Sequence, residues 1–345
     1  MARETVNPRT ALGTEASAIR VIGRFELSVI VKLMDLNRLE FSLTTKCNSQ
    51  CAYCQADAGP WRKEVMEASD ARNYLSETAK VADLKSFLVF GGEPMLYPTR
   101  AITIFKKARQ LSIPRIGMLT NGIWGKKEAE AERLAEKLKN SGLNVLGISV
   151  DAFHLQFIPL ICARNAAQAA VRAGIEHVTW NVAVLESLDG ANHYDKITNH
   201  ILKELRPVGI EAHIHKVSAA GRALRTMLQY FQKTPIDGPC EGETPMENTV
   251  KNPQSITIEP CGEVDICWHL SIGNAKDTPL GQIVSDYDWR KNPIIKTLAE
   301  EGPIGLLKRY ESRVEHSNRS AYVNKCHLCT EVRRAIDTKK TDLGI

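Results

Sequence analysis

The sequence has no run of about 18 consecutive apolar residues, the length that a helix needs to cross a membrane. Residues 1–14 are polar and interrupted by Pro8, so they lack the apolar core of a secretory signal peptide. No dense Lys/Arg run is interleaved with aromatic residues, and the net charge of +5 is mild for 345 residues. Nucleic-acid binding therefore has no support, and we expect a cytoplasmic protein without a membrane anchor.

Internal repeats and low-complexity segments are also absent. The composition, 43% hydrophobic and 25% charged, is typical of a globular chain that buries a substantial core. The length allows one large α/β domain, or a domain of about 200 residues with a smaller one attached, which we expect. Nine cysteines are present. In a reducing cytoplasm they are better explained as metal ligands or redox groups than as disulfides.

Short β-type runs recur at a regular spacing along the first two thirds of the chain: 39–43, 86–90, 115–119, 145–150, 177–184 and 210–215. Amphipathic helical patterns such as 126–140 separate them. This rhythm predicts a parallel sheet, either open or part of a βα barrel.

The rhythm stops near residue 234, where prolines and glycines interrupt the chain. Residues 255–268 then predict a β-hairpin that turns at Pro260, Cys261 and Gly262. Before the first strand, residues 16–36 carry an amphipathic pattern that we expect to form a helix capping the sheet.

Three cysteines follow the first predicted strand as C-x3-C-x2-C: Cys47, Cys51 and Cys54. Thiolates are the usual ligands of iron–sulfur clusters. A structural zinc site would normally have a fourth ligand close by, and the nearest histidine is His154. Three ligands on a four-iron cluster would leave one iron open. A zinc site or a redox-sensing thiol cluster is the alternative.

This spacing resembles the defining motif of the radical S-adenosylmethionine (SAM) superfamily. The resemblance implies that the open iron of a 4Fe-4S cluster binds SAM, and that reductive cleavage yields a 5′-deoxyadenosyl radical. It also implies that Tyr53 lies against the adenine. The turn Gly91-Gly92-Glu93-Pro94 after the second strand resembles the family's GGEP motif, which holds the SAM amino group. Independently, two glycines at a strand end allow close approach of a ligand to the backbone.

Polar residues also follow the next predicted strands, at the same edge of the sheet as the cysteine triplet and the Gly91–Pro94 turn. The resemblance implies that Ser149 and Asp151 contact the ribose or carboxylate of SAM, and we place Asn121 and Asn181 among the cofactor-binding residues. Turn and helix-cap chemistry is the alternative for Ser149 and Asp151. For Asn181 and His154 the alternative, a satisfied polar residue near the core, is the favoured interpretation.

Two further residues have a functional and a structural interpretation. Arg222 lies in a loop, 219–223, that resembles one found in many relatives, and its guanidinium could hold a carboxylate in bidentate fashion. A solvated arginine is the alternative. The glycine-rich pattern that the family usually has on its fifth strand is absent here. Cys162 lies on an apolar helical run and is predicted to be a buried structural thiol.

Five cysteines lie beyond residue 234: Cys240, Cys261, Cys267, Cys326 and Cys329. With Gly262 they resemble the auxiliary-cluster domains called SPASM or, when shortened, twitch. Cys261 at the hairpin tip and Cys267 at its far end would be about 15 to 20 Å apart, too far for one cluster. Relatives commonly have an aspartate where Cys261 stands. We therefore assign one auxiliary 4Fe-4S cluster to Cys240, Cys267, Cys326 and Cys329, with a zinc site as the alternative.

The sequence thus predicts an α/β fold, a partial (β/α)6 TIM-like barrel with a small C-terminal auxiliary-cluster domain that contains a β-hairpin. The predicted parts are an N-terminal capping segment (1–36), the radical SAM barrel (37–234) and the twitch/SPASM-like domain with its tail (235–345). The expected activity is hydrogen abstraction from a peptide or protein side chain, with ferredoxin or flavodoxin as electron donor. A small-molecule or cofactor precursor is the alternative substrate, and a non-catalytic iron–sulfur redox or sensor protein is the alternative of another class.

Overall fold

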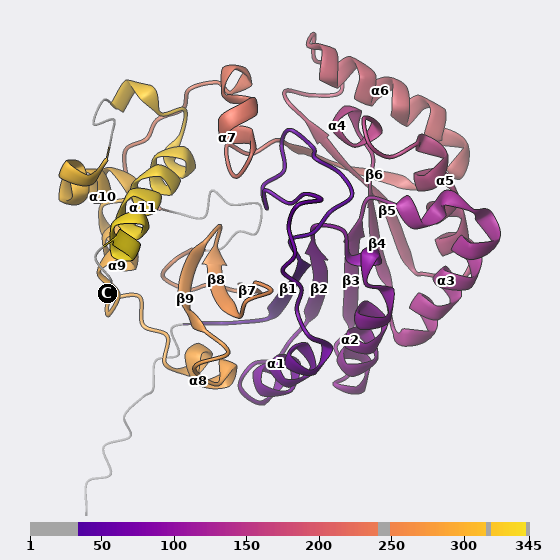
Figure 1. The fold of residues 1–345 in the computed structure, drawn as a ribbon, viewed down its shortest axis with the longest axis horizontal. Coiled ribbons are helices and arrows are strands. Elements are labelled where there is room, and N and C mark those ends of the chain that lie inside the picture. Colours follow the sequence, from indigo (N-terminus) through magenta and orange to yellow (C-terminus); the bar gives the residue numbers. More distant parts are fainter. Residues whose placement is uncertain (1–33, 241–248, 315–318, 343–345) are drawn as a thin grey trace, which may run out of the picture. The chain divides into compact units, whose positions relative to one another are not determined.

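The computed structural model describes residues 34–240, 249–314 and 319–342. The helix expected at residues 16–36 lies almost entirely outside the described residues. Residues 32–345 form one compact unit, whose strands and helices are shown in Figure 1. None of the helices in the described part of the chain is long and apolar enough to cross a membrane.

Six parallel strands form the main part of the sheet, at the positions that the sequence predicts: β1 (Arg38–Thr44), β2 (Ser86–Gly91), β3 (Arg115–Thr120), β4 (Val145–Ser149), β5 (His177–Val184) and β6 (Glu211–Lys216). They pair in sequential order, and β1 and β6 are not neighbours in the sheet. The predicted partial βα barrel is therefore confirmed, because the six strands do not close on themselves.

The predicted hairpin is also confirmed, as β7 (Ser255–Ile258) and β8 (Glu263–Cys267), and the sequence analysis missed a third strand, β9 (Leu270–Asn274). Strand β7 pairs in parallel with β1, so the hairpin extends the barrel sheet into nine strands in the order β6-β5-β4-β3-β2-β1-β7-β8-β9. The strands that follow residue 234 thus continue the sheet of the barrel.

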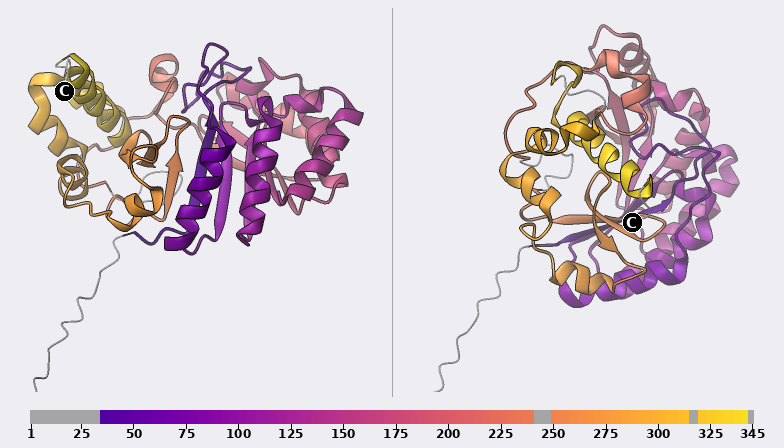
Figure 2. Two further views of the ribbon diagram at one scale, coloured as in Figure 1. Left: turned by 60° about the horizontal axis from the view of Figure 1, so that its bottom comes forward. Right: turned by 60° about the vertical axis from the view of Figure 1, so that its left-hand side comes forward.

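Helices between the strands cover the outer face of the sheet: α1 (Ala68–Val81), α2 (Pro98–Gln110), α3 (Glu128–Ser141), α4 (Ala152–Leu155), α5 (Leu160–Arg172) and α6 (His193–Leu205). Figure 2 shows α1 and α2 in front of the strands that they cover. In β1, Phe41 points outward, since its ring meets Tyr74 of α1 at 6.4 Å. Because side chains alternate along a strand, Glu40, Ser42 and Thr44 point to the inner face.

Beyond β6 the chain adds further helices: α7 (Ala223–Thr226), α8 (Leu280–Ser285), α9 (Pro293–Glu300), α10 (Pro303–Tyr310) and α11 (Lys325–Asp342). Helix α8 packs against α1, where the backbone N–H of Leu280 donates to the Glu77 carboxylate at 2.6 Å. Buried apolar residues from β7, β8, α8, α9 and α10 belong to the same core as those of the barrel. The C-terminal segments are thereby fixed to the barrel by burial of apolar surface.

Candidate functional site

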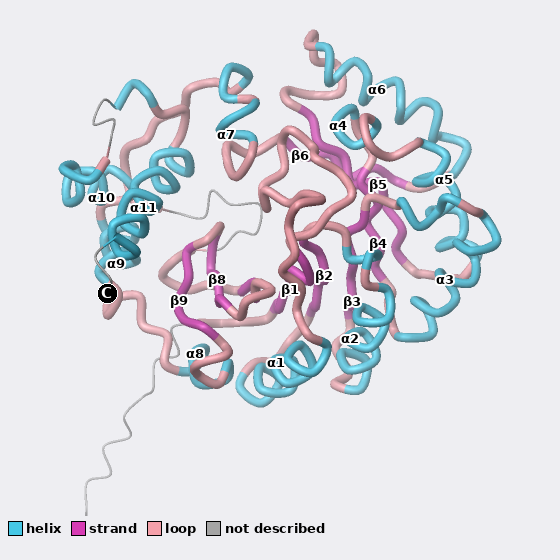
Figure 3. The backbone as a smooth tube through the Cα atoms, in the orientation of Figure 1, coloured by secondary structure: helices cyan, strands magenta, loops and turns pink. Residues whose placement is uncertain are grey.

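The cysteine triplet lies on the long loop after β1, which covers the carboxyl ends of the first strands and approaches α7 (Figure 3). The loop is closed on itself, because Cys47 N–H donates to the Gly59 carbonyl and Gly59 N–H donates to the Thr45 carbonyl, both at 3.2 Å. Cys51 is buried, whereas Cys47 and Cys54 are half-buried. Pinning both ends of the loop fixes where the three thiols lie.

The three thiols are close enough to influence one another. Burial, with the charges of Glu93, Cys51 and Cys54 adding to it, raises the pKa of the Cys47 thiol to about 12. Backbone N–H groups of Ser49 and Ala58 approach the sulfurs of Cys47 and Cys54, each at 3.4 Å. Thiolates in such a place need a positive partner, and a metal centre supplies one. The chemistry of this donor set therefore fits an iron–sulfur cluster.

Glycines at two neighbouring turns allow this loop to pack directly on the barrel. A Cβ on Gly92 would lie 2.1 Å from the Lys46 carbonyl oxygen, and one on Gly221 would lie 2.2 Å from the Gln55 carbonyl oxygen. The sequence analysis assigned the close approach at Gly91 and Gly92 to a ligand. In the structure the space beside them is filled by the backbone of the cysteine loop. The Glu93 N–H donates to the Lys46 carbonyl of this loop at 2.9 Å.

Glu93 is fully buried at the end of β2. Its Oε1 accepts from Thr120 Oγ1 and Met95 N, and its Oε2 accepts from Asn121 N at 2.7 Å. Burial raises the pKa of this carboxyl despite those donors. Among the described residues no Lys or Arg forms an ion pair with it. A carboxylate oxygen has two lone pairs, so Oε2 can accept from one more donor, such as an ammonium group. Pro94, also buried, opens the short 3₁₀ turn that follows.

Asp151 lies at the centre of a buried network after β4. Its carboxylate caps α4 by accepting from the N–H groups of Phe153 and His154, and it contacts His154 Nδ1 at 2.9 Å. Burial opposes ionisation, but the charge and hydrogen bonds of His154 outweigh it and lower the pKa of Asp151. The helix-cap alternative thus describes what Asp151 does in the structure.

Two ring side chains connect this network to the cysteine loop. Tyr53 Oη donates to Asp151 at 3.4 Å, and its ring packs edge-on against Phe153 with centroids 5.0 Å apart. Burial opposes protonation of His154, but Asp151 and the neighbouring Cys51 thiol, with which it hydrogen-bonds, raise its pKa well above the usual range. His154 therefore lies beside the triplet, a closeness that the sequence does not reveal.

The remaining predicted cofactor contacts lie on the strand ends around the loop. Asn121 is buried, and its side-chain amide donates to Asn48 Oδ1 at 3.0 Å and faces the Cys47 sulfur at 3.8 Å. Ser149 and Asn181 are half-buried neighbours across β4 and β5. The structure thus brings Asn121 to the triplet and holds Ser149 and Asn181 on the adjacent strands.

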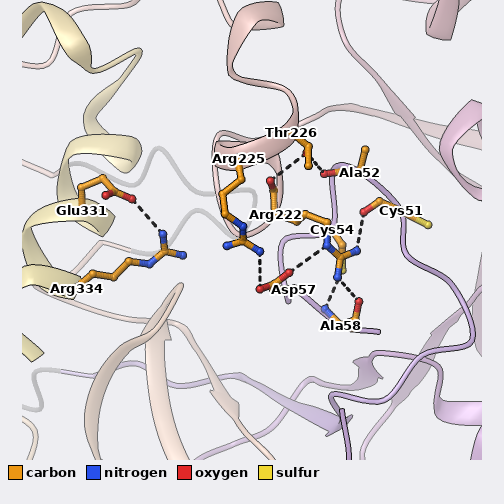
Figure 4. A network of polar contacts seen from close by, with 10 residues as sticks. All are labelled: Cys51, Ala52, Cys54, Asp57, Ala58, Arg222, Arg225, Thr226, Glu331 and Arg334. Carbon is orange, nitrogen blue, oxygen red and sulfur yellow. Dashed lines mark hydrogen bonds and ion pairs between the residues drawn. The ribbon is translucent and has the colours of Figure 1, made fainter. Parts of the chain in front are cut away.

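In this structure the Arg222 side chain contacts other residues of the protein. Its guanidinium donates to the Asp57 carboxylate at 3.1 Å and to the carbonyls of Cys51 and Ala58, and its own N–H donates to the Cys54 carbonyl (Figure 4). Each of the three guanidinium nitrogens thus has a partner within the protein, and Arg222 braces the cysteine loop. It is 7% exposed, which differs from the solvated arginine that was the alternative.

A second group of thiols lies in the C-terminal third. The pKa of Cys267, at the end of β8, is raised to about 12 by burial and by the charges of three further cysteines, Cys329, Cys326 and Cys240. Cys261 is exposed at the hairpin turn, and the charges that act on its thiol come from Glu and Lys residues. Cys329, Cys326 and Cys240 are therefore near enough to Cys267 for their charge to act on its thiol, whereas Cys261 is exposed.

Arg333, on α11, is a residue of this second group that the sequence analysis missed. It is 9% exposed, its Nε donates to the Cys329 sulfur at 3.3 Å, and its other nitrogens donate to the carbonyls of Trp268 and His269. Its position four residues after Cys329, on the same helix face, is a signal that could have found it. Cys162, in contrast, is buried in α5 as predicted.

A third group, also missed, consists of Glu259, Asp265 and His269 around the β7–β8 hairpin. Burial and the charge of Glu259 raise the pKa of Asp265 to about 8. The alternation that predicted the hairpin from its apolar residues also places Thr257, Glu259 and Asp265 together on the opposite face. An acidic residue at such a position in a buried strand is the signal that could have indicated a site.

Comparisons with known proteins agree with the site. Residues 41–181 match the sequence model of the Radical SAM superfamily. The chain is similar to a probable GTP 3′,8-cyclase of Methanocaldococcus jannaschii, 30% identical over 120 residues, 35% of this chain and 38% of that protein. It is also similar to the putative peptide biosynthesis protein YydG of Bacillus subtilis, 24% identical over 170 residues, 48% of this chain and 50% of that protein.

Among solved structures, native anSMEcpe with bound AdoMet is 14% identical and aligns with a TM-score of 0.48 over 89% of this chain and 99% of that one. The chain spans about 38% to 50% of the length of the two curated relatives named above. The superfamily match begins in β1, includes the cysteine triplet and the Gly91–Pro94 turn, and ends in β5. Through these residues the chain is similar to the radical SAM superfamily of enzymes.

Proposed function

We propose that this protein reductively cleaves SAM at a 4Fe-4S cluster held by Cys47, Cys51 and Cys54 and uses the resulting 5′-deoxyadenosyl radical to abstract hydrogen from a substrate. The observation that carries the proposal is the position of Glu93, a fully buried carboxylate without an ion-pair partner among the described residues, directly against the loop of three thiols. A cluster with three protein ligands has an open iron, and a carboxylate beside it can bind the SAM ammonium.

The residues around the loop then have defined tasks. Glu93 accepts from the ammonium, and Thr120 and the backbone of Asn121 hold its carboxylate in place. Asp151 fixes His154 and Tyr53 next to Cys51 and Cys54. Arg222 and Gly221 hold the far side of the loop. The chemistry of bond cleavage belongs to the cofactor, and the protein contributes position and exclusion of water. SAM and an external electron donor such as ferredoxin or flavodoxin complete the reaction.

We further propose one auxiliary 4Fe-4S cluster on Cys240, Cys267, Cys326 and Cys329, in the manner of a twitch or SPASM domain. The mutual influence of these thiols supports the proposal. Arg333 favours it as well, because a buried guanidinium that donates to a ligand sulfur stabilises negative charge there. The same four thiols could bind zinc, and iron and zinc analysis of the purified protein distinguishes the two.

A peptide or protein side chain is the substrate that we favour. One relative is named as a putative peptide biosynthesis protein, which supports this choice. GTP 3′,8-cyclases among the relatives support the second candidate, a small-molecule cofactor precursor. A non-catalytic iron–sulfur protein, the candidate of another class, has no use for the buried carboxylate at the thiol loop.

Anaerobic reconstitution followed by SAM and dithionite tests the proposal. The expected result is 5′-deoxyadenosine together with methionine, and a bound cluster without SAM cleavage would instead favour the electron carrier or sensor. Addition of a candidate peptide, such as one encoded beside the gene, should then give a mass change that depends on SAM and reductant. Unmodified peptides together with faster 5′-deoxyadenosine release by a small metabolite such as GTP would favour the second candidate.

A further inference from the structure

The inner face of the sheet carries a group of acidic residues where the hairpin joins the barrel. Glu40 of β1 lies opposite Thr257 of β7, and Thr257 lies opposite Asp265 of β8, so the three share one face. Glu259 follows two residues after Thr257 and accepts a hydrogen bond from Ser42 of β1. Ser42 stands five residues before Cys47. The group therefore lies on the inner wall that leads to the triplet loop.

Asp265 is the most unusual member of this group. It is 6% exposed, and its Oδ1 is buried without a hydrogen-bond partner. Acceptor atoms of Glu259, Asp265 and His269 all lie within 4.8 Å of one another. A buried acceptor left unpaired destabilises the folded protein. Because Asp265 Oδ1 is such an acceptor, the group is incomplete without a hydrogen-bond donor or a cation from a ligand.

Nearby positive groups do not fill this role. Arg333 acts on Asp265 electrostatically, but its three nitrogens donate to the carbonyls of Trp268 and His269 and to the Cys329 sulfur. Among the described residues no ion pair joins Arg333 to Asp265. Arg62 and Asp57, from the triplet loop, also act electrostatically on His269, and among the described residues no ion pair joins Arg62 to Asp265. The group is thus within electrostatic reach of the triplet loop.

The spacing of the acceptors lies between the spacings that two kinds of donor would set. His269 Nδ1 lies 4.0 Å from Asp265 Oδ2. Tetrahedral metal ions with bonds of about 2.1 Å would bring two such ligands to about 3.4 Å. An ammonium group, with hydrogen bonds of about 2.9 Å, separates its acceptors by about 4.7 Å. The number of acceptors favours the ammonium, because three acceptors match three N–H donors.

We propose that Glu259 and Asp265, with His269 at the rim, form a recognition site for a primary ammonium group of the substrate, such as a lysine side chain. The proposal rests on the proposed function, since it assigns the site to the substrate of the radical reaction. It favours a cationic peptide over a nucleoside triphosphate, because an ammonium favours the ionised form of the two carboxyl groups, whereas phosphates disfavour it.

The test compares two blocked tripeptides, acetyl-Gly-Lys-Gly-amide and the same peptide with Nζ-acetyllysine, for binding to the reconstituted enzyme with SAM. Anaerobic calorimetry should show that the wild type prefers the charged peptide by about tenfold or more. Asp265→Asn and Glu259→Gln, which keep the side-chain shape, should remove the preference. Asp277→Asn, an exposed carboxylate after β9, should retain it. Melting temperature and iron content establish that each variant is folded.

SAM cleavage without peptide separates this proposal from the proposed function. Asp265→Asn should still form 5′-deoxyadenosine, because Asp265 does not contact the triplet. Equal affinity for the two peptides, or no measurable binding of either, would overturn the ammonium site even where SAM is cleaved. Stoichiometric binding of Mn²⁺ or Zn²⁺ that is lost in Asp265→Asn would also overturn it and assign the group to a metal.

Discussion

Replacement of Arg222 by alanine should release the cysteine loop from the C-terminal side of the barrel. The guanidinium bridges 165 residues of sequence to reach Asp57, and the same side chain holds the carbonyls of Cys51 and Ala58. Its plane also lies over the Trp61 ring, 5.3 Å from the centroid. Arg222→Ala removes all of these contacts at once. Arg222→Lys keeps the positive charge but lacks the planar set of N–H donors of the guanidinium.

The expected magnitude follows from burial. The Arg222 side chain is 9% exposed and that of Asp57 is 28% exposed, so solvent screens the pair only weakly. Removing one partner of a buried charged pair costs about 3 to 5 kcal/mol. Arg225 offers a matched control because it contacts the same Asp57 carboxylate at 2.8 Å but is 54% exposed. An exposed pair contributes at most about 1 kcal/mol, so Arg225→Ala should have little effect.

Two measurements on the same variants test this reasoning. Urea unfolding of the apo protein gives the loss of stability, and iron analysis after reconstitution reports whether the triplet still holds its cluster. We expect Arg222→Ala to lose stability and the iron of the triplet, Arg222→Lys to fall between, and Arg225→Ala to resemble the wild type. Equal losses in Arg222→Ala and Arg225→Ala, or full iron in Arg222→Ala, would refute the bracing role.

Two further predictions concern the cysteine groups and the glycine turn. Cys267→Ser should lower the iron content by about four per chain, whereas Cys261→Ser should leave it unchanged; equal losses measured by elemental analysis would show that the ligand set is wrong. Gly92→Ala should cost at least about 2 kcal/mol, because its Cβ would lie 2.1 Å from the Lys46 carbonyl oxygen. Gly174→Ala, with nothing within 4 Å, should cost about 1 kcal/mol from backbone conformation alone, and similar unfolding midpoints for the two would contradict the packing argument.

Local patterns were enough to predict the strands. Each β-type run of the barrel coincides with an observed strand to within one or two residues, because apolar periodicity and turn residues are local signals. The pairing of β7 with β1 could not be predicted this way. It joins Arg38 to Ser255, and nothing in either segment specifies so distant a partner. For the same reason the hairpin was assigned to a separate part of the chain.

The functional residues show a similar division. The C-x3-C-x2-C spacing identifies the triplet because three ligands on one short loop are a local feature. The contact of Arg222 with Asp57 could not be predicted, because the two residues are distant in sequence. Gly92 shows that a glycine at a strand end predicts close approach but not what approaches, which here is the backbone of residue 46.

The central claim is that the three thiols of Cys47, Cys51 and Cys54 hold the cluster that cleaves SAM. Its most direct test is the triple alanine variant, reconstituted anaerobically beside the wild type and incubated with SAM and dithionite. The wild type should contain about eight irons per chain and the variant about four, since the auxiliary site stays intact. 5′-Deoxyadenosine should form with the wild type and be absent with the variant. Its formation by a variant that lacks all three thiols would contradict the claim.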